Sequence, residues 1–165
     1  MRLRREKDHR FFVSATQDGV REVRPFYKSD GALRQGQRHD PHPRARRWRE
    51  KAENVLDSYF SGRVRRFSIP CDLQGLTPFT HAVLKITCRI PYGEVRSYRW
   101  IAESVGRPKA ARAVGNALAR NPVPILIPCH RVVRSNGSLG GYALGSKWKK
   151  MLLEMENKHA RRLQS

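Results

Sequence analysis

Apolar and polar residues alternate near the start of the 165-residue chain and recur at helical spacing further along it. Two β-prone runs, residues 11–16 and 20–26, flank Gln17-Asp18-Gly19. An Asp-Gly pair between such runs favours a tight turn, so we expect a β-hairpin. Residues 28–50 hold few large apolar side chains and many arginine, glycine, proline and histidine residues, which predicts a loop-rich segment.

Helical spacing begins at Ala52, and the apolar residues up to Phe60 share one face before Gly62 provides a stop signal. We expect this helix and the hairpin to form a small N-terminal α/β domain over residues 1–75. A mostly helical C-terminal domain follows over residues 76–165. The predicted fold class is therefore α+β.

The C-terminal domain contains two short predicted helices that are spaced as in a DNA-binding unit. Ser97 is a suitable N-cap for a helix over residues 98–104, a glycine-containing turn follows, and Pro108 predicts a second helix that ends near Arg120. The outer face of the second helix is basic. Residues 97–120 thus fit a winged-helix-like helix-turn-helix. An ordinary αα-hairpin with a solvated basic face fits the same pattern.

An active-site segment is predicted over residues 121–145. Its first part, residues 121–128, is apolar and rich in proline, so we expect it to be extended and buried, with Cys129 directly after it. A glycine-rich loop completes the segment, and a closing helix begins near Ser146. On that helix, the residues expected to face the core are Trp148, Met151, Leu152 and Met155.

The sign of the charge narrows the choice of partner. The chain has 34 Lys and Arg residues against 14 Asp and Glu residues, a formal net charge of +20 that is spread along its length. Such an excess attracts polyanions, so nucleic acid is the first partner to consider and an anionic membrane surface the second. No apolar run reaches the roughly 18 residues of a membrane helix, and no secretory signal is evident. Three cysteines are too few for a disulfide framework, so we expect a cytoplasmic protein.

Cys129 is the residue with the clearest candidate chemistry. A thiol becomes a good nucleophile when a base removes its proton, and His130 is adjacent in sequence. Because adjacent residues of an extended chain point to opposite sides, His130 would reach the sulfur only through a turn or a bridging water. Glu156, on the edge of the closing helix, is better placed than Glu154 to orient the imidazole. A small buried hydrophobic residue is the alternative interpretation of Cys129.

No metal site is predicted. His39 and His42 lie close together in the loop-rich segment, but no pair of cysteines accompanies them, as a zinc site would require. The glycines after Cys129 lack the strand–loop–helix context of a nucleotide-binding fingerprint, so they indicate a flexible loop.

Several motifs resemble one family, in order along the chain. Pro128-Cys-His-Arg-Val132 is similar to the active-site signature of the O6-alkylguanine-DNA alkyltransferases, also called methylated-DNA–protein-cysteine methyltransferases. The resemblance extends to Ile90-Pro-Tyr-Gly-Glu-Val-Arg-Ser-Tyr98, Gly106-Arg-Pro-Lys-Ala-Ala-Arg-Ala-Val-Gly115, Asn121-Pro, Gly140-Gly-Tyr142 and Leu152-Leu-Glu-Met-Glu156. It covers residues 53–157, whereas residues 1–50 are similar to the family's variable N-terminal domain only in general character.

The resemblance implies direct repair of DNA in which the protein itself accepts an alkyl group. Cys129 would be the acceptor, and His130 and Glu156 would form a relay that acts through a water. Asn121 would hold the turn that presents the active-site segment. Tyr98 would hydrogen-bond the flipped guanine and assist its protonation as it leaves.

The resemblance also implies how DNA is held. Arg112 would enter the base stack where the guanine has left, and small side chains would let the helix approach the minor groove closely. The DNA-binding residues implied are Lys109, Ala110, Ala111, Arg112, Ala113, Gly115 and Asn116. Those of the substrate pocket are Leu118, Val132, Tyr142 and Ala143. Ala143 stands where some relatives carry a serine. It has no hydroxyl, so only its backbone is available to the base.

On this basis we expect a single-turnover methylated-DNA–protein-cysteine methyltransferase that moves an alkyl group irreversibly from O6-alkylguanine to Cys129. Its partner would be double-stranded DNA, and it would act as a monomer without a cofactor, a metal, a membrane or an obligate protein partner. Three alternatives stay open: a non-catalytic binder of alkylated DNA, a helix-turn-helix regulator and a cysteine hydrolase. Proteins of the first kind replace the acceptor cysteine, and a regulator leaves the Pro-Cys-His-Arg-Val segment unexplained.

Overall fold

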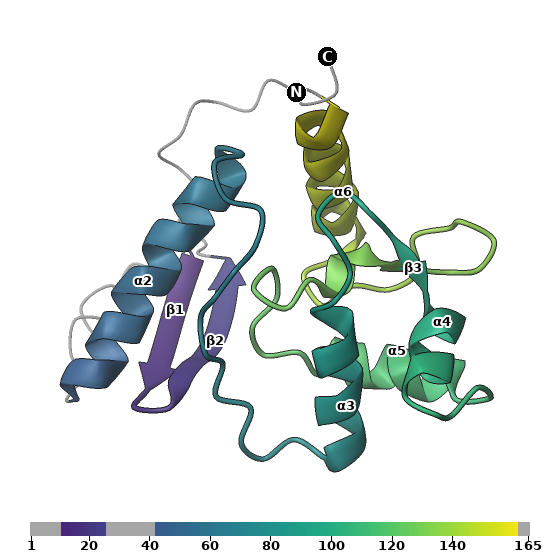
Figure 1. Ribbon diagram of the computed structural model, residues 1–165, viewed down its shortest axis with the longest axis horizontal. Coiled ribbons are helices and arrows are strands. Elements are labelled where there is room, and N and C mark those ends of the chain that lie inside the picture. The colour runs from purple at the N-terminus through teal and green to yellow at the C-terminus, as the bar shows by residue number, and fades with distance from the viewer. Residues whose placement is uncertain (1–10, 26–41, 162–165) are drawn as a thin grey trace. The chain divides into compact units, whose positions relative to one another are not determined.

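The computed structural model describes residues 11–25 and 42–161, and the chain divides into two compact units after Asp72 (Figure 1). The sequence predicted this division after residue 75. Helices dominate the described residues, and short strands form two sheets of two strands each. The predicted α+β class is confirmed. No helix within these ranges is both long and apolar enough to cross a membrane.

The N-terminal unit begins with the predicted hairpin. β1 (Phe11–Thr16) pairs antiparallel with β2 (Gly19–Pro25). The Val20 N–H also donates to Pro70 O at 2.9 Å, which ties the end of the unit to the hairpin. This close approach requires glycine at position 19, where a Cβ would lie 2.5 Å from Pro70 O.

α2 (Pro43–Phe60) packs along the hairpin, and the structure corrects the prediction of where it begins. The apolar pattern predicted a start at Ala52 and a loop over residues 28–50. Residues 43–50 are helical instead, and residues 28–41 lie outside the described part of the chain. The predicted end is confirmed, because Gly62 follows α2 with a φ of +74°.

The early start of α2 has a local cause that apolar spacing does not reveal. His42 caps the helix by accepting the Arg44 N–H at 3.2 Å, and Pro43 occupies the first turn. Of the first two turns, only the small side chain of Ala45 is buried, and several arginines surround it in the sequence. One small side chain is too weak an apolar signal to mark a helix.

The C-terminal unit holds the predicted short helices and one sheet that the sequence did not predict. Its elements are α3 (Pro78–Thr87), β3 (Arg96–Ser97), α4 (Tyr98–Ser104), α5 (Ala111–Ala119), the 3₁₀ turn η2 (Cys129–Arg131), β4 (Val132–Val133) and α6 (Ser146–Arg161). β3 and β4 pair in parallel, with Arg96 opposite Val132. Strands of two residues are too short to show a period of two in the sequence.

α5 is shorter than predicted. Pro108 was expected to open it, but Arg107 to Ala110 form a turn that the Ala110 N–H closes on Arg107 O at 2.9 Å. Lys109 and Ala110 therefore precede the helix. The prediction was wrong at this end because proline suits the second position of a turn as well as the first position of a helix.

Residues 121–128 are buried, as predicted, but they are not extended. Ile125 has a φ of +76°, and the Ile127 N–H donates to Val123 O at 3.0 Å, so the chain folds back on itself. The Asn121 side chain bridges this turn, donating to Ile127 O at 3.0 Å and accepting from the Val123 N–H at 3.1 Å. These side-chain hydrogen bonds outweigh the local preference for an extended chain.

α6 begins at Ser146 as predicted, but its buried face is not the apolar one that was expected. Lys149, Leu152 and Glu156 are fully buried. The other residues of the predicted face are half-buried, namely Trp148, Met151 and Met155. Charged side chains lie inside a protein only where partners compensate them, and here the partners come from distant segments.

Candidate functional site

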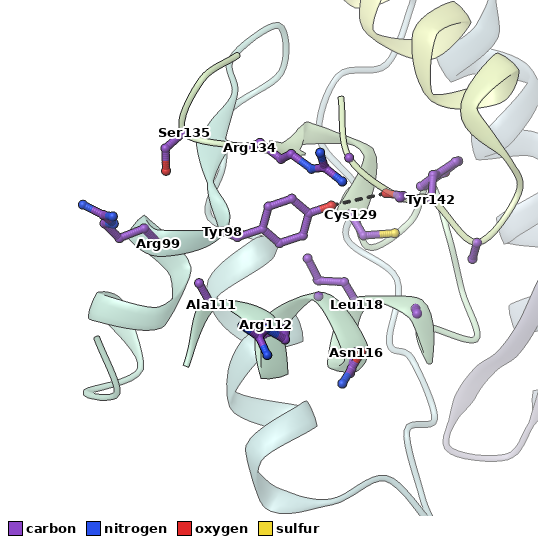
Figure 2. Close-up of a pocket in the computed structure, with 15 residues that line it drawn as sticks. Tyr98, Arg99, Ala111, Arg112, Asn116, Leu118, Cys129, Arg134, Ser135 and Tyr142 are labelled. Carbon is purple, nitrogen blue, oxygen red and sulfur yellow. Dashed lines mark hydrogen bonds between the residues drawn. The ribbon is translucent and has the colours of Figure 1, made fainter. Parts of the chain in front are cut away.

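A pocket of about 700 Å³ lies in the C-terminal unit and brings together the two predicted functional regions (Figure 2). α4 and α5 supply part of its wall, and Cys129 and the loop after it supply the rest. The predicted site residues that line it are Tyr98, Ala111, Arg112, Gly115, Asn116, Leu118, Cys129, Tyr142 and Ala143. Those that lie outside its lining are Lys109, Ala110, Ala113, Asn121, His130, Val132 and Glu156.

Cys129 occupies the first position of the 3₁₀ turn η2. Its sulfur accepts a hydrogen bond from the Asn121 amide at 3.1 Å, and the residue is 4% exposed. The same amide bridges the folded segment before it. One side chain therefore positions both the backbone that leads to Cys129 and its sulfur.

Burial raises the pKa of the Cys129 thiol to about 11, although the Asn121 hydrogen bond and the charge of Lys149 lower it. The resting sulfur is therefore a neutral thiol near neutral pH. Because a thiol is a weak nucleophile, any reaction at this sulfur requires that its proton be removed as the new bond forms.

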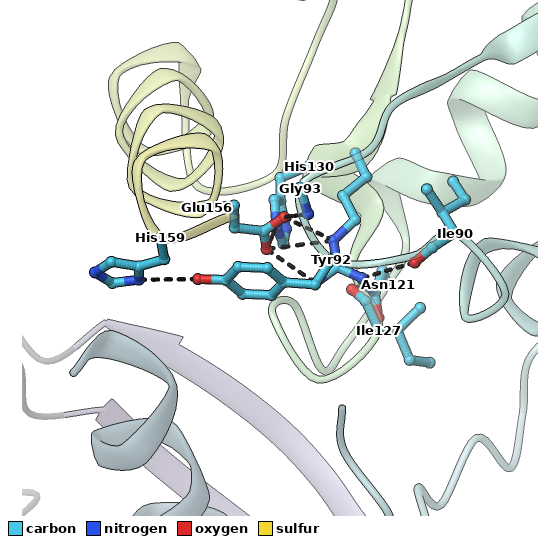
Figure 3. A network of polar contacts seen from close by, with 9 residues as sticks. Ile90, Tyr92, Gly93, Asn121, Ile127, His130, Glu156 and His159 are labelled. Atoms are coloured by element: carbon cyan, nitrogen blue, oxygen red, sulfur yellow. Dashed lines mark hydrogen bonds and ion pairs between the residues drawn. The ribbon is translucent and has the colours of Figure 1, made fainter. Parts of the chain in front are cut away.

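A buried polar network includes the residue next to Cys129 (Figure 3). His130 Nε2 and Glu156 Oε1 are 2.8 Å apart, and both side chains are fully buried. Burial lowers the pKa of His130, although the hydrogen bond to Glu156 raises it, so the imidazole is neutral near pH 7. A carboxylate only accepts hydrogen bonds, so Nε2 carries the ring proton. The lone pair of the neutral ring then lies on Nδ1, which makes His130 a base at that atom.

The Glu156 carboxylate accepts hydrogen bonds from two further residues. Arg131 donates through Nε to Oε2 and through Nη2 to Oε1, each at 2.9 Å, and the Gly93 N–H donates to Oε2 at 3.0 Å. Burial alone would raise the pKa of this carboxyl, but the hydrogen bonds and charges of His130 and Arg131 outweigh it and lower the pKa to about 2. Glu156 is therefore ionised at neutral pH.

The network continues through Arg131 into the loop before β3. Arg131 Nη1 donates to Ile90 O at 2.7 Å, and its guanidinium lies 5.5 Å from the centre of the Tyr92 ring. The Tyr92 hydroxyl lies 3.0 Å from His159 Nδ1 on α6 (Figure 3). The loop, η2 and α6 are thus joined by one set of buried and half-buried polar contacts.

Lys149 is a functional candidate that the sequence analysis missed. Its ammonium donates to Val132 O at 2.6 Å, to Gly141 O at 3.0 Å and to the Tyr98 hydroxyl at 3.5 Å. Burial lowers its pKa to about 8. Lys149 lies seven residues before Glu156, so the two share one face of the helix. That spacing could have indicated from the sequence that Lys149 points toward the same site as Glu156.

Tyr98 lies beside Cys129 in the pocket wall (Figure 2), and its hydroxyl donates to Gly141 O at 3.3 Å. Burial and the charge of Cys129 raise the pKa of Tyr98, whereas Arg134 lowers it. Arg134 and Arg99 line the pocket and were also missed. Both are exposed, so no apolar pattern reveals them.

No candidate metal centre lies within residues 11–25 and 42–161, where no group of three His, Cys, Asp or Glu side chains is arranged to hold an ion. His42 caps α2. The second histidine of the loop-rich segment, His39, lies outside the described residues.

Comparison with known sequences identifies relatives of this chain. The family profile described as "6-O-methylguanine DNA methyltransferase, DNA binding domain" matches residues 78–158. A methylated-DNA–protein-cysteine methyltransferase of Methanosarcina barkeri is 48% identical over 111 residues, which cover 67% of this chain and 70% of the relative. One from Mycobacterium leprae is 51% identical over 106 residues, which cover 64% of each chain.

Solved structures extend the similarity to both units. A crystal structure of Mycobacterium tuberculosis OGT in complex with DNA is 35% identical and has a TM-score of 0.74, with 90% of this chain and 87% of that chain covered. The O6-methylguanine-DNA methyltransferase of Pyrococcus kodakaraensis is 26% identical with a TM-score of 0.65, and 92% and 95% are covered.

Glu156→Gln tests how much the buried carboxylate stabilises the fold. The pKa of Glu156 falls from its ordinary 4.5 to about 2 on folding, so its ionised form contributes stability above pH 4.5 that is lost as the pH falls through about 2. This shift corresponds to about 3 kcal/mol. Because Arg131 would keep a buried charge, we expect the variant to lose about 3–5 kcal/mol at pH 7. Urea unfolding from pH 7 to pH 2 measures both effects.

Glu154→Gln is the matched control, since Glu154 is exposed and lies 3.8 Å from Lys150 on the same helix. We expect it to change the free energy of unfolding by less than about 0.5 kcal/mol. Equal effects of the two variants would show that the Glu156 network does not stabilise the fold.

Proposed function

The chain belongs to the methylated-DNA–protein-cysteine methyltransferase family, and on that premise we propose that Cys129 is the cysteine that accepts the alkyl group. Members of the family repair DNA by moving an alkyl group to a cysteine, so DNA is the partner of this protein. The observation that carries the assignment is the position of Cys129 in the pocket wall, followed in sequence by a histidine that is hydrogen-bonded to a buried carboxylate. The monomeric state and the cytoplasmic location stay predictions from the sequence.

The burial of the sulfur supports a substrate base that leaves the DNA stack. A sulfur in a residue that is 4% exposed cannot reach a guanine inside a duplex, so the base must rotate into the pocket. A volume of about 700 Å³ is sufficient for a purine with an alkyl group on O6. The Tyr142 hydroxyl is buried and bonds to no described protein atom, so it is available to that base.

α4, the turn and α5 act as the helix-turn-helix that approaches the minor groove. Arg112 is exposed and lines the pocket, which suits a side chain that fills the gap left by the rotated base. Ala113 is also exposed, and Gly115 is half-buried. Such small residues let the helix backbone come close to the DNA. Lys109, in the turn before α5, is exposed and suited to a phosphate.

The proposed transfer is an in-line displacement. The bond from Cys129 Sγ to the alkyl carbon forms as the bond from that carbon to guanine O6 breaks. The thiol proton passes to His130 Nδ1 through a water, and Glu156 stabilises the imidazolium that results. Tyr98 supplies a proton to the departing guanine, and the proton held by the imidazolium then returns to the tyrosinate through solvent, so both side chains end neutral. The products are a thioether on Cys129 and an unmodified guanine.

Lys149 makes the two proton transfers feasible in a buried site. Its positive charge lowers the pKa of Cys129, against the larger effect of burial. It also donates a hydrogen bond to the Tyr98 hydroxyl, so it stabilises the charge that develops when Tyr98 gives up its proton. A thioether carries no good leaving group, so we expect one transfer per protein molecule.

Intact mass after incubation with a duplex that holds one O6-methylguanine tests the acceptor. We expect a gain of one methyl group, about 14 Da, that saturates at one per protein and maps to Cys129. Cys129→Ser should gain no mass and keep its affinity for the duplex, whereas Cys71→Ser and Cys88→Ser should react as the parent does. A gain in Cys129→Ser would refute the assignment, and lesion-selective binding without any mass change would indicate a non-catalytic binder.

Gly140→Ala tests the position of Tyr98. A Cβ at residue 140, where φ is +67°, would lie 2.8 Å from the Tyr98 hydroxyl and 3.0 Å from its ring, so the ring must shift. We expect the transfer rate to fall at least 10-fold, about 1.4 kcal/mol. Gly137→Ala, in the same loop at a φ of +82° with nothing within 4 Å, is the control for backbone strain alone. Equal losses in the two variants would contradict a role for Tyr98.

The pH dependence of single-turnover transfer tests Lys149, whose pKa is about 8. As the pH rises through about 8, the lysine loses the charge that favours the thiolate, so we expect the rate to fall there. Lys149→Met should be at least 10-fold slower at pH 7, about 1.4 kcal/mol, and should lack this alkaline decline. The exposed Lys147 lies on the same helix, and Lys147→Met should match the parent. If the transfer rate of Lys149→Met still fell above about pH 8, the decline would belong to the titration of another group.

A further inference from the structure

One side of α2 in the N-terminal unit carries only positive charges. Arg44, Arg47 and Lys51 are exposed and are spaced three and four residues apart, so they lie on one side of the helix. We call these three residues the basic flank. Asn54 and Ser58, which continue the same side, are neutral.

The acidic residues of α2 lie on another side of the helix. Glu50, Glu53 and Asp57 follow one another at the same spacing, and they share that side with Arg46. Arg49 Nη1 lies 3.2 Å from Glu53, and Arg49 Nη2 lies 4.0 Å from Glu50. Among the described residues, no ion pair involves the basic flank.

Arg44, the first residue of the basic flank, opposes the stability of the helix that carries it. The N-terminal end of a helix is the positive end of its dipole, so acidic residues are favourable there and basic ones are not. The first turn of α2 contains no acidic residue, and Arg44 follows Pro43 at its start. A basic residue at this end of the helix does not help the protein to fold, so we infer that its positive charge serves function.

Trp48 organises the flank. Its indole N–H donates to Gln17 O in the hairpin turn at 3.3 Å, which fixes the ring against the N-terminal unit. Arg47 and Lys51 lie 5.8 and 5.7 Å from the centre of that ring. The two cations are therefore held beside an anchored aromatic ring.

We propose that the basic flank binds the phosphate backbone of DNA, as a second contact in addition to the one made by the pocket-bearing unit. Its seven-residue span is about 10 Å long, while one DNA strand presents a phosphate about every 3.4 Å along the helix axis. Among the described residues the one exposed large apolar side chain is Val95, in the other unit, and the Trp48 ring beside the flank is half-buried and hydrogen-bonded to the hairpin, so the flank lacks exposed apolar side chains for insertion into a membrane. The proposal rests on DNA as the partner and not on the chemistry at Cys129.

The test is the salt dependence of binding to an undamaged 30-base-pair duplex. Arg44→Gln/Arg47→Gln/Lys51→Gln should lower the slope of log K against log salt by about two to three, because each phosphate contact contributes about 0.9. We expect its affinity at low salt to fall at least 10-fold. Arg46→Gln/Arg63→Gln/Arg66→Gln removes the same charge from exposed sites off the flank and should lower the slope by less than one. Equal slopes for the two triple variants would overturn the proposal.

A second readout locates the contact and checks the fold. The Trp48 indole N–H resonance should shift when the duplex is added to the parent protein and should not shift in the flank variant. The melting temperature of that variant should be unchanged or higher, because the charge of Arg44 has left the positive end of the helix dipole. A static Trp48 resonance would refute the proposal, as would a variant that loses binding to phosphatidylserine vesicles but not to DNA. Since the duplex is undamaged, these outcomes are independent of whether Cys129 accepts an alkyl group.

Discussion

The buried carboxylate of Glu156 is the constraint on which the C-terminal unit depends. A charge with no exposure to water is tolerated only if donors surround it, and two segments that pack against α6 supply them: the loop at Gly93 and the η2 turn with His130 and Arg131. The carboxylate therefore specifies how these segments meet. It also fixes which nitrogen of His130 carries a proton, so the same interaction that holds the fold prepares the base.

The burial that builds the site also creates its main chemical difficulty. It raises the pKa of the Cys129 thiol and lowers those of His130 and Lys149, so burial disfavours the charged form of all three groups. Lys149 and the Asn121 amide act against this effect at the sulfur. A site of this kind keeps the thiol unreactive until a substrate enters and protons can move in concert with bond formation.

Positive charge in this protein is distributed between two tasks. In the C-terminal unit, Arg99, Arg112 and Arg134 line a pocket whose substrate belongs to a polyanion. In the N-terminal unit, the basic flank of α2 begins with Arg44 in the first turn, where a positive charge is unfavourable to the helix. The proposed second contact would give each unit a share in holding DNA, while only one of them carries out the chemistry.

The sequence alone determined what depends on neighbours in the chain. The hairpin at β1 and β2, the capped helix α4 and the order of motifs from Ile90 to Glu156 were all predictable, because turns, caps and motifs are local. Only the tertiary structure decided that Lys149 is buried and that residues 121–128 fold back, since the carbonyl and amide groups responsible come from segments that sequence spacing does not relate. The start of α2 was not predicted for the same reason. The contacts that bury Ala45 form only in the folded protein, and one alanine is too weak an apolar signal in the sequence. Local preference is encoded along the chain, but burial of a polar group depends on partners that only folding brings within reach.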